Sequence, residues 1–228
     1  MIAQLKMCEN IRMDSQVMRG RIVLKDSIIE DGVITVEGQF ISHICPASDF
    51  SGELPQSSGS TFLPGLVDVH CHGGGGESFP NATTPEAAMQ AVMEHRRHGT
   101  TSLVASCVTA DADTLKARAR TLASLAEKDE IAGIHFEGPF VSHARCGAQD
   151  PTYIVDPDPD LTRELIDECK GYALSMTLAP EKPRAFGEGS VAEALIDGGA
   201  IPSWGHTDSN STFARQALEY SREPFADS

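Results

Sequence analysis

Polar side chains that can bind a metal stand at the ends of three apolar runs in this sequence. The first run after residue 61 ends in His70 and His72, the third ends in Glu137, and the fifth ends in His206. Imidazole and carboxylate groups are ligands that Zn²⁺ and other divalent first-row metals accept. The sequence therefore predicts that these four residues bind a divalent metal.

The spacing of the first two residues strengthens this prediction. On an extended strand the side-chain period is two, so His70 and His72 should lie on one face and reach the same ion. A histidine taken alone is more often an ordinary surface or core residue, and that alternative stays open for each of them singly. The paired spacing, together with the strand-end positions of Glu137 and His206, favours the metal site.

Five apolar runs alternate with helical patterns over the rest of the chain. This alternation predicts a parallel α/β sheet. Five such βα units suit part of a (β/α)8 barrel of the TIM type, in which functional groups collect at the C-terminal ends of the strands. The expected strands are residues 62–72, 101–106, 131–137, 173–180 and 201–206.

Helix-capping residues mark where several of the intervening helices should begin. Thr84 can cap a helix that has Pro85 at its first position, and Asp160 can cap a later one. Asn210 or Ser211 should cap the last helix. These signals place the helices between the strands, as the barrel requires.

The segment before residue 62 has a different, β-rich pattern. Gly38 lies between two apolar runs and predicts a hairpin. The polar stretch 46–61, which contains Pro, Gly and Ser, reads as a linker. We therefore expect a small N-terminal β-sandwich-type domain over residues 1–61 and an incomplete barrel over residues 62–228.

Composition limits the partners of the chain. Its 228 residues carry a net charge of −15, which argues against nucleic acid and anionic membranes as partners. No apolar stretch approaches the roughly 18 residues of a membrane span. The six cysteines are scattered without a CxxC pair, which is typical of reduced thiols in a cytoplasmic protein.

Several motifs then resemble one known family. Residues 63–72, Leu-Pro-Gly-Leu-Val-Asp-Val-His-Cys-His, resemble the first-strand signature of the amidohydrolase superfamily. The motif His-Phe-Glu-Gly-Pro-Phe at 135–140 and the motif Gly-His-Thr-Asp at 205–208 are more specific, and they resemble the N-acetylglucosamine-6-phosphate deacetylases. Supporting similarities lie at 72–76, 145–149 and 179–181.

The resemblance implies a reaction and a ligand arrangement. The reaction is hydrolysis of the acetamide of N-acetylglucosamine 6-phosphate to glucosamine 6-phosphate and acetate, a step of amino-sugar catabolism. Glu137 would be the central ligand, with His206 on one side and His70 and His72 on the other, for one or two ions. Zn²⁺ is the first choice, with Fe, Mn and Co as alternatives. Full-length members of the family are expected to be homo-oligomers.

The resemblance also assigns substrate contacts and points to missing parts. Ala148 and Gln149 align with residues that contact the sugar, although the family has histidine where this chain has Gln149. The family's catalytic aspartate on the last barrel strand would fall beyond Ser228, so no catalytic residue is assigned within the chain. We expect a C-terminally truncated enzyme with little activity of its own.

Two other functions stay open. The chain could be a non-catalytic remnant that only binds metal. It could also be an amidohydrolase acting on a cyclic amide, as the dihydropyrimidinase-like enzymes do. Those enzymes use a carboxylated lysine on the fourth strand, whereas this chain has Leu-Ala-Pro-Glu at 178–181, which disfavours that alternative.

Five residues near these motifs have more ordinary expectations. Cys71 should point away from the flanking histidines and pack in the core, while Asp68 and His135 should lie close behind the ligands. His95 and His98 are predicted on the polar side of a helix, at the surface.

Overall fold

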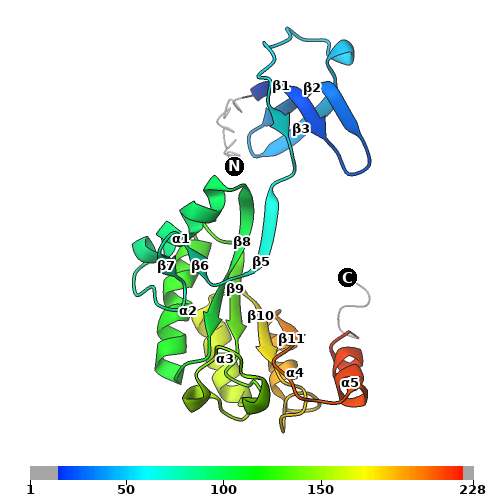
Figure 1. Ribbon diagram of the computed structural model, residues 1–228. Helices are drawn as coiled ribbons and strands as arrows, with labels where there is room; N and C mark the ends of the chain where they lie inside the picture. The colour runs from blue at the N-terminus through cyan, green and yellow to red at the C-terminus, as the bar shows by residue number, and fades with distance from the viewer. Residues whose placement is uncertain (1–14, 223–228) are drawn as a thin grey trace, which may run out of the picture. The chain divides into compact units, whose positions relative to one another are not determined.

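The computed structural model describes residues 15–222 and divides the chain into two compact units, with the division after Pro64 (Figure 1). The first unit contains one four-stranded sheet in the order β3-β2-β1-β4. A small core of Val33, Cys45 and Ala47 lies beneath it. Within residues 15–64 we see this one sheet and no second layer, so the expected sandwich is not observed there.

The strands of this sheet follow the apolar runs of the sequence. Their bounds are β1 Ser15–Val23, β2 Ile28–Glu37, β3 Phe40–Pro46 and β4 Thr61–Phe62. A single 3-10 turn, Ala47–Asp49, follows β3. The predicted hairpin at Gly38 is confirmed, because β2 and β3 pair antiparallel around it and Gly38 has φ of +61°.

The apolar run that was expected to form one strand from Phe62 to His72 is divided into two. Phe62 belongs to β4, which pairs with β1, while the strand of the second unit, β5, begins at Leu66. Pro64 has no N–H to donate to a sheet. A Cβ at Gly65 would lie 1.9 Å from the Thr101 hydroxyl oxygen, so only glycine fits there. The prediction of one continuous strand was wrong for this reason.

The second unit is built on a five-stranded parallel sheet in the order β11-β10-β9-β8-β5. This confirms the predicted partial barrel of five βα units. The strands are β5 Leu66–Cys71, β8 Thr100–Val108, β9 Gly133–Glu137, β10 Ala173–Leu178 and β11 Ile201–Trp204. Directly after β5, the short strands β6 Gly73–Gly74 and β7 Glu77–Ser78 form a tight hairpin.

Helices α1 to α4 pack along one face of this sheet (Figure 1). Thr84 caps α1 with Pro85 at its first position, and Asn210 caps α5, as predicted. Asp158, rather than Asp160, caps α3, because Pro159 takes the first helical position. The helices are α1 Pro85–Arg97, α2 Ala112–Ala126, α3 Pro159–Glu168, α4 Val191–Asp197 and α5 Ser211–Arg222, with 3-10 turns at His143–Arg145 and Pro151–Tyr153.

The two faces of the sheet have different environments. Leu103, Ile134 and Met176 point toward the helices and are buried in the main core. The opposite face carries polar and apolar side chains around a cavity of about 380 Å³. Apolar side chains on this sheet remain exposed, namely Leu66, Val67, Val69, Leu174 and Ile201. Across residues 15–222, none of the helices has the length and apolar character needed to span a membrane.

Candidate metal centre

The structure brings the four predicted ligands together at the C-terminal ends of β5, β9 and β11. The Nε2 atoms of His70 and His72 are 3.0 Å apart. The carboxylate of Glu137 lies 3.1 Å from Nε2 of His72 and 3.8 Å from Nε2 of His70. Oε1 of the same carboxylate, which faces His70, also lies 2.8 Å from Nε2 of His206. Glu137 is therefore the residue that all three imidazoles approach.

The backbone after β11 is shaped to bring His206 into this position. His206 follows the strand by two residues and has φ of +48°, a left-handed conformation that is uncommon for a residue with a side chain. Asp129, Lys170 and Arg184 also have positive φ, but His206 is the one of these four residues that contacts Glu137. Gly147 packs against the His206 ring, where a Cβ would lie 3.4 Å from Cε1.

Backbone carbonyl groups fix the orientation of two of the rings. Nδ1 of His206 lies 2.7 Å from the Arg145 carbonyl oxygen, and Nδ1 of His72 lies 3.3 Å from that of Ser106. A proton on Nδ1 donates to the carbonyl oxygen in each case. Nε2 of the protonated ring then donates to Glu137, and Nε2 of the neutral ring has a lone pair available for a cation. Metal-binding histidines are oriented in the same way by a hydrogen bond from the other ring nitrogen. The donor set of this site therefore fits a divalent cation.

The electrostatics of the cluster keep Glu137 ionised. The hydrogen bond with His72 has the largest effect on the pKa of Glu137 and lowers it. Burial acts in the opposite direction, the hydrogen bond with His206 lowers the pKa further, and the result is a pKa of about 2. The hydrogen bond to Glu137 in turn raises the pKa of His72 above 6.5, against the effect of burial. Glu137 thus stays ionised well below neutral pH, and its carboxylate suits a cation.

His135 lies close to the ligands, as expected. It is buried, with Nδ1 2.7 Å from the Ser175 hydroxyl and Nε2 3.0 Å from the Thr177 hydroxyl. Its ring centroid is 4.9 Å from that of His70. Burial is the main cause that lowers the pKa of His135 to about 4, and the charge of the neighbouring His70 adds to it. This ring is therefore neutral near pH 7.

The two residues predicted to contact substrate lie in different surroundings. Ala148 is exposed, while Gln149 is 7% exposed. The Gln149 side-chain amide donates to Glu137 over 2.6 Å, and its oxygen accepts from the Thr109 backbone N–H over 2.8 Å. Both ends of the Gln149 side chain are therefore engaged with the protein, and it supports the central carboxylate.

The structure also shows contacts around the site that the sequence analysis missed. The Arg145 guanidinium pairs with Asp208 over 2.7 Å, which joins the loop after β9 to the segment after β11. Glu181, after β10, accepts hydrogen bonds from the Thr207 hydroxyl and the Asp208 N–H. Burial works to raise the pKa of Glu181, but these hydrogen bonds outweigh it and lower the pKa. The motifs at 145–149, 179–181 and 205–208 contain these residues, but they gave no sign of the contacts among them.

Known proteins share these sequence features. Residues 61–207, which are more than half of the chain, match the profile of the amidohydrolase family. The chain belongs to the amidohydrolase family. Enzymes of this family are metal-dependent, in agreement with the cluster of His70, His72 and Glu137, whose ligand atoms all lie within 4.8 Å of one another.

Named relatives of this amidohydrolase are sugar-phosphate deacetylases. This chain is 32% identical over 212 residues to the N-acetylglucosamine-6-phosphate deacetylase of Bacillus subtilis (strain 168). The match covers 87% of this chain and 52% of the relative. It is 28% identical over 195 residues to the N-acetylgalactosamine-6-phosphate deacetylase of Shewanella sp. (strain ANA-3), covering 84% of this chain and 47% of the relative. The chain spans about half the length of the curated relatives it matches.

A solved structure has the same fold over most of this amidohydrolase. It is a variant of the N-acetyl-D-glucosamine-6-phosphate deacetylase of Mycobacterium smegmatis in complex with N-acetyl-D-glucosamine-6-phosphate. The TM-score is 0.81 at 31% sequence identity, and the match covers 90% of this chain and 53% of the other. The five-stranded half-barrel is therefore an arrangement found in these deacetylases.

Proposed function

We propose that this amidohydrolase acts on the acetamide of N-acetylglucosamine 6-phosphate, giving glucosamine 6-phosphate and acetate in amino-sugar catabolism. The observation that carries the proposal is the convergence of His70, His72 and His206 on Glu137, in a chain whose relatives are sugar-phosphate deacetylases. The cytoplasm suits this reaction, since the substrate is a charged metabolite and five described cysteines carry free thiols.

The metal is proposed to be bound by these same four side chains. Three imidazole nitrogens and a carboxylate suit Zn²⁺ best, with Fe, Mn or Co as alternatives. When bound, a divalent cation supplies a Lewis acid for the amide carbonyl and lowers the pKa of water to about 7. Glu137 is ionised for this role, and Gln149 holds its carboxylate in place through the 2.6 Å hydrogen bond.

Hydrolysis also requires a group that accepts a proton from water and returns it to the leaving amine. The described acidic residues around the cluster have other tasks: Glu137 faces the imidazoles, Asp208 pairs with Arg145, and Glu181 binds Thr207. The proposed reaction therefore needs a proton acceptor from outside the described residues. For this reason we expect residues 15–222 by themselves to bind metal but to release acetate only slowly.

A cyclic-amide hydrolase is a weaker alternative. It would need a lysine at the end of β10, where this chain has Leu178 followed by Ala-Pro-Glu. Lys182 comes next, but its ammonium group lies 3.2 Å from Asp156 and forms an ion pair there. The described part of β10 and the loop after it thus provide no lysine for a metal bridge.

The decisive experiment is a segment exchange in a complete relative. Residues 61–207 of this chain would replace the matching segment of the Bacillus subtilis deacetylase, and acetate release from N-acetylglucosamine 6-phosphate would be measured together with metal content. We expect the chimera to bind metal and release acetate, because the ligands come from the exchanged segment. N-acetylgalactosamine 6-phosphate would be assayed in parallel to define the preferred sugar.

The matched control is the same chimera carrying Glu137→Gln. It should keep its far-ultraviolet circular dichroism while losing acetate release and the metal held by His70, His72 and His206. A chimera that is folded and loaded with metal but releases no acetate from either sugar phosphate would refute the proposed function. Metal content near zero in a folded chimera would refute the ligand assignment itself.

A further inference from the structure

A bulge in β5 brings two metal-binding side chains to the face opposite the site described above. Asp68 pairs with Leu103 and Cys71 with Ala105, so three steps along β5 match two along β8. Leu103 and Ala105 both point toward the helices and are buried. The extra residue therefore places Asp68 and Cys71 on the helix side of the sheet, while His70 remains on the other side.

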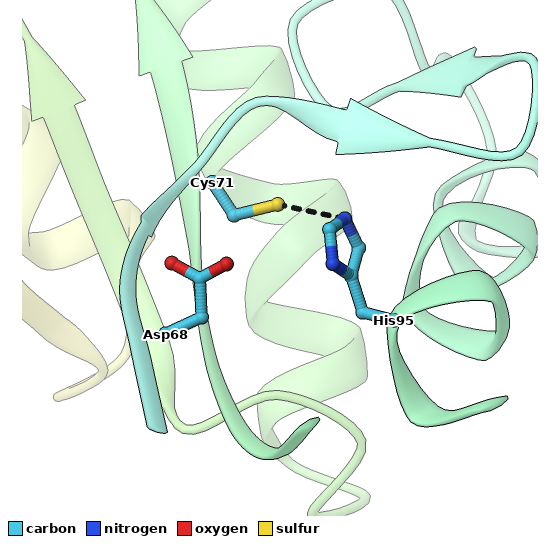
Figure 2. A group of neighbouring side chains, drawn as sticks. All are labelled: Asp68, Cys71 and His95. Atoms are coloured by element: carbon cyan, nitrogen blue, oxygen red, sulfur yellow. Dashed lines mark hydrogen bonds between the residues drawn. The ribbon is translucent and has the colours of Figure 1, made fainter. Parts of the chain in front are cut away.

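Helix α1 supplies a third side chain at the same point (Figure 2). Nε2 of His95, in the last turn of α1, lies 3.1 Å from Sγ of Cys71 and 3.1 Å from the Gly73 carbonyl oxygen. One ligand atom each from Asp68, Cys71 and His95 lie within 4.8 Å of one another. The expectation that His95 is a plain surface residue was wrong, because its side chain turns inward to β5.

The hairpin after β5 leaves space for this approach. A Cβ at Gly74 would lie 3.0 Å from Nε2 of His95, so a larger residue would push the ring away. Cys71 is 5% exposed, and Asp68 and His95 are half-buried. The cluster is thus enclosed between the sheet, the hairpin and α1.

We infer that Asp68, Cys71 and His95, with the Gly73 carbonyl oxygen, form a second divalent-cation site suited to Zn²⁺. From ordinary Zn–S, Zn–N and Zn–O lengths, the edges of a tetrahedral site are about 3.4–3.6 Å. The measured separations are 3.1 Å for Cys71 to His95, 3.1 Å for His95 to Gly73, and 3.8 Å for Cys71 to Gly73. The donor atoms of Cys71, His95 and Gly73 therefore have separations close to those of a zinc site, and a ligand atom of Asp68 lies within 4.8 Å of those of Cys71 and His95.

The chemistry of the donors also selects the ion. A thiolate, an imidazole, a carboxylate and a carbonyl suit Zn²⁺, whereas Mg²⁺ and Ca²⁺ prefer oxygen donors alone. A thiolate from Cys71 and the carboxylate of Asp68 together balance the charge of a divalent cation. Asp68 also accepts a hydrogen bond from the backbone N–H of His70 over 3.1 Å, which connects this site to the strand that carries the proposed ligands His70 and His72.

This second site does not depend on the proposed deacetylase function, because no ligand is shared with the cluster around Glu137. The two can be distinguished by their donors: Cys71 gives the second site a sulfur ligand, and the first has nitrogen and oxygen only. A cobalt ion bound to a thiolate shows a near-ultraviolet charge-transfer absorption that nitrogen and oxygen ligands do not produce. Cobalt therefore serves as the probe.

The experiment titrates the chelator-treated chain with Co²⁺ and then measures bound Zn²⁺ in a parallel sample. The wild-type chain should show the charge-transfer absorption, and Cys71→Ser should lose it together with one equivalent of Zn²⁺. Glu137→Gln should keep the absorption while losing metal at the first site. Cys146→Ser is the matched control for a thiol outside the second site and should behave as the wild type.

His95→Gln provides an independent variant in case Cys71→Ser does not fold, and it should also lose the absorption. Folding of each variant would be checked by the emission of Trp204. Absence of the charge-transfer absorption in the wild-type chain would overturn the inference. An absorption that persists in folded Cys71→Ser or folded His95→Gln would overturn it as well, because the thiolate would then come from elsewhere.

Discussion

Replacement of Gln149 by methionine tests how the central carboxylate is supported. Methionine has nearly the length and shape of glutamine, so Gln149→Met removes the two hydrogen bonds with little change in packing. The bonds join Gln149 to the Glu137 carboxylate and to the Thr109 N–H, over 2.6 Å and 2.8 Å. The variant should be less stable and should bind metal more weakly, since Glu137 is then held less firmly.

The expected size of the effect follows from these two bonds. A hydrogen bond to a charged group contributes about 1.5–3 kcal/mol, and a buried N–H left without a partner costs about 1–3 kcal/mol. Neighbouring contributions are not additive, and water can enter to satisfy part of the loss. We therefore expect the free energy of unfolding to fall by about 3 kcal/mol.

Urea denaturation of the metal-free chain, followed by tryptophan fluorescence, measures this quantity directly. The single tryptophan, Trp204, lies in β11, so its emission reports on the second unit. Ala148→Ser is the matched control, because the neighbouring side chain is exposed and its change should alter stability by less than about 0.5 kcal/mol.

The reasoning would be refuted by a loss below about 0.5 kcal/mol in Gln149→Met with an unchanged denaturant slope. Such a result would mean that water or another donor replaces Gln149 at little cost. An equal loss in Ala148→Ser would locate the effect in the loop backbone, and so would also contradict the assignment to the two hydrogen bonds.

Three further predictions concern the same cluster. In the 228-residue chain, Glu137→Gln should remove the metal held by the three imidazoles, measured as one equivalent or more lost by elemental analysis with unchanged circular dichroism. In metal-free protein, the pair of Glu137 and His72 should stabilise fully between pH 4.5 and 6.5, the ordinary values of the two groups. Its contribution should be lost as pH falls toward the lowered pKa of Glu137, about 2, or rises through the raised pKa of His72. Cation affinity should instead increase as pH rises through the raised pKa of His72, because an imidazole must be neutral to bind a metal. Urea midpoints of the metal-free protein should therefore fall over this pH range while the affinity from calorimetric titration rises. Stability and affinity that change in the same direction would contradict this prediction. Arg145→Ala should cost less than about 1 kcal/mol and leave metal affinity unchanged, because its pair with Asp208 is exposed at 63% and 50% and His206 binds the backbone carbonyl. A large loss of metal in this variant would show that the ion pair positions His206 after all.

The parallel half-barrel and the meeting point of the ligands were predictable because they depend on regular patterns. Strand and helix periods identify the five βα units, and the ends of parallel strands must lie on one side of the sheet. The sequence alone therefore predicts that His70, His72, Glu137 and His206 lie together. Their role as metal ligands stays a prediction that the metal analysis above tests.

The predictions that were wrong or incomplete have equally specific physical causes. The start of β5 at Leu66, rather than at residue 62, depends on how closely Gly65 approaches Thr101, which no local pattern reveals. The inward turn of His95 depends on a hairpin of glycines folding beside α1 and on a bulge in β5, both of which are tertiary features. The double engagement of Gln149 depends on a loop conformation, and loops carry little periodic signal.

The exposed apolar side chains on the open sheet, among them Val67, Val69 and Ile201, affect what any stability measurement means. Each is more than half exposed, at 68%, 67% and 53%. Any molecule that covers them binds the folded state and not the unfolded one, so by mass action it raises the apparent melting temperature. A melting temperature for this protein therefore has meaning only when the protein concentration is stated. Where other copies of the chain cover these side chains, the melting temperature should rise as the protein concentration increases.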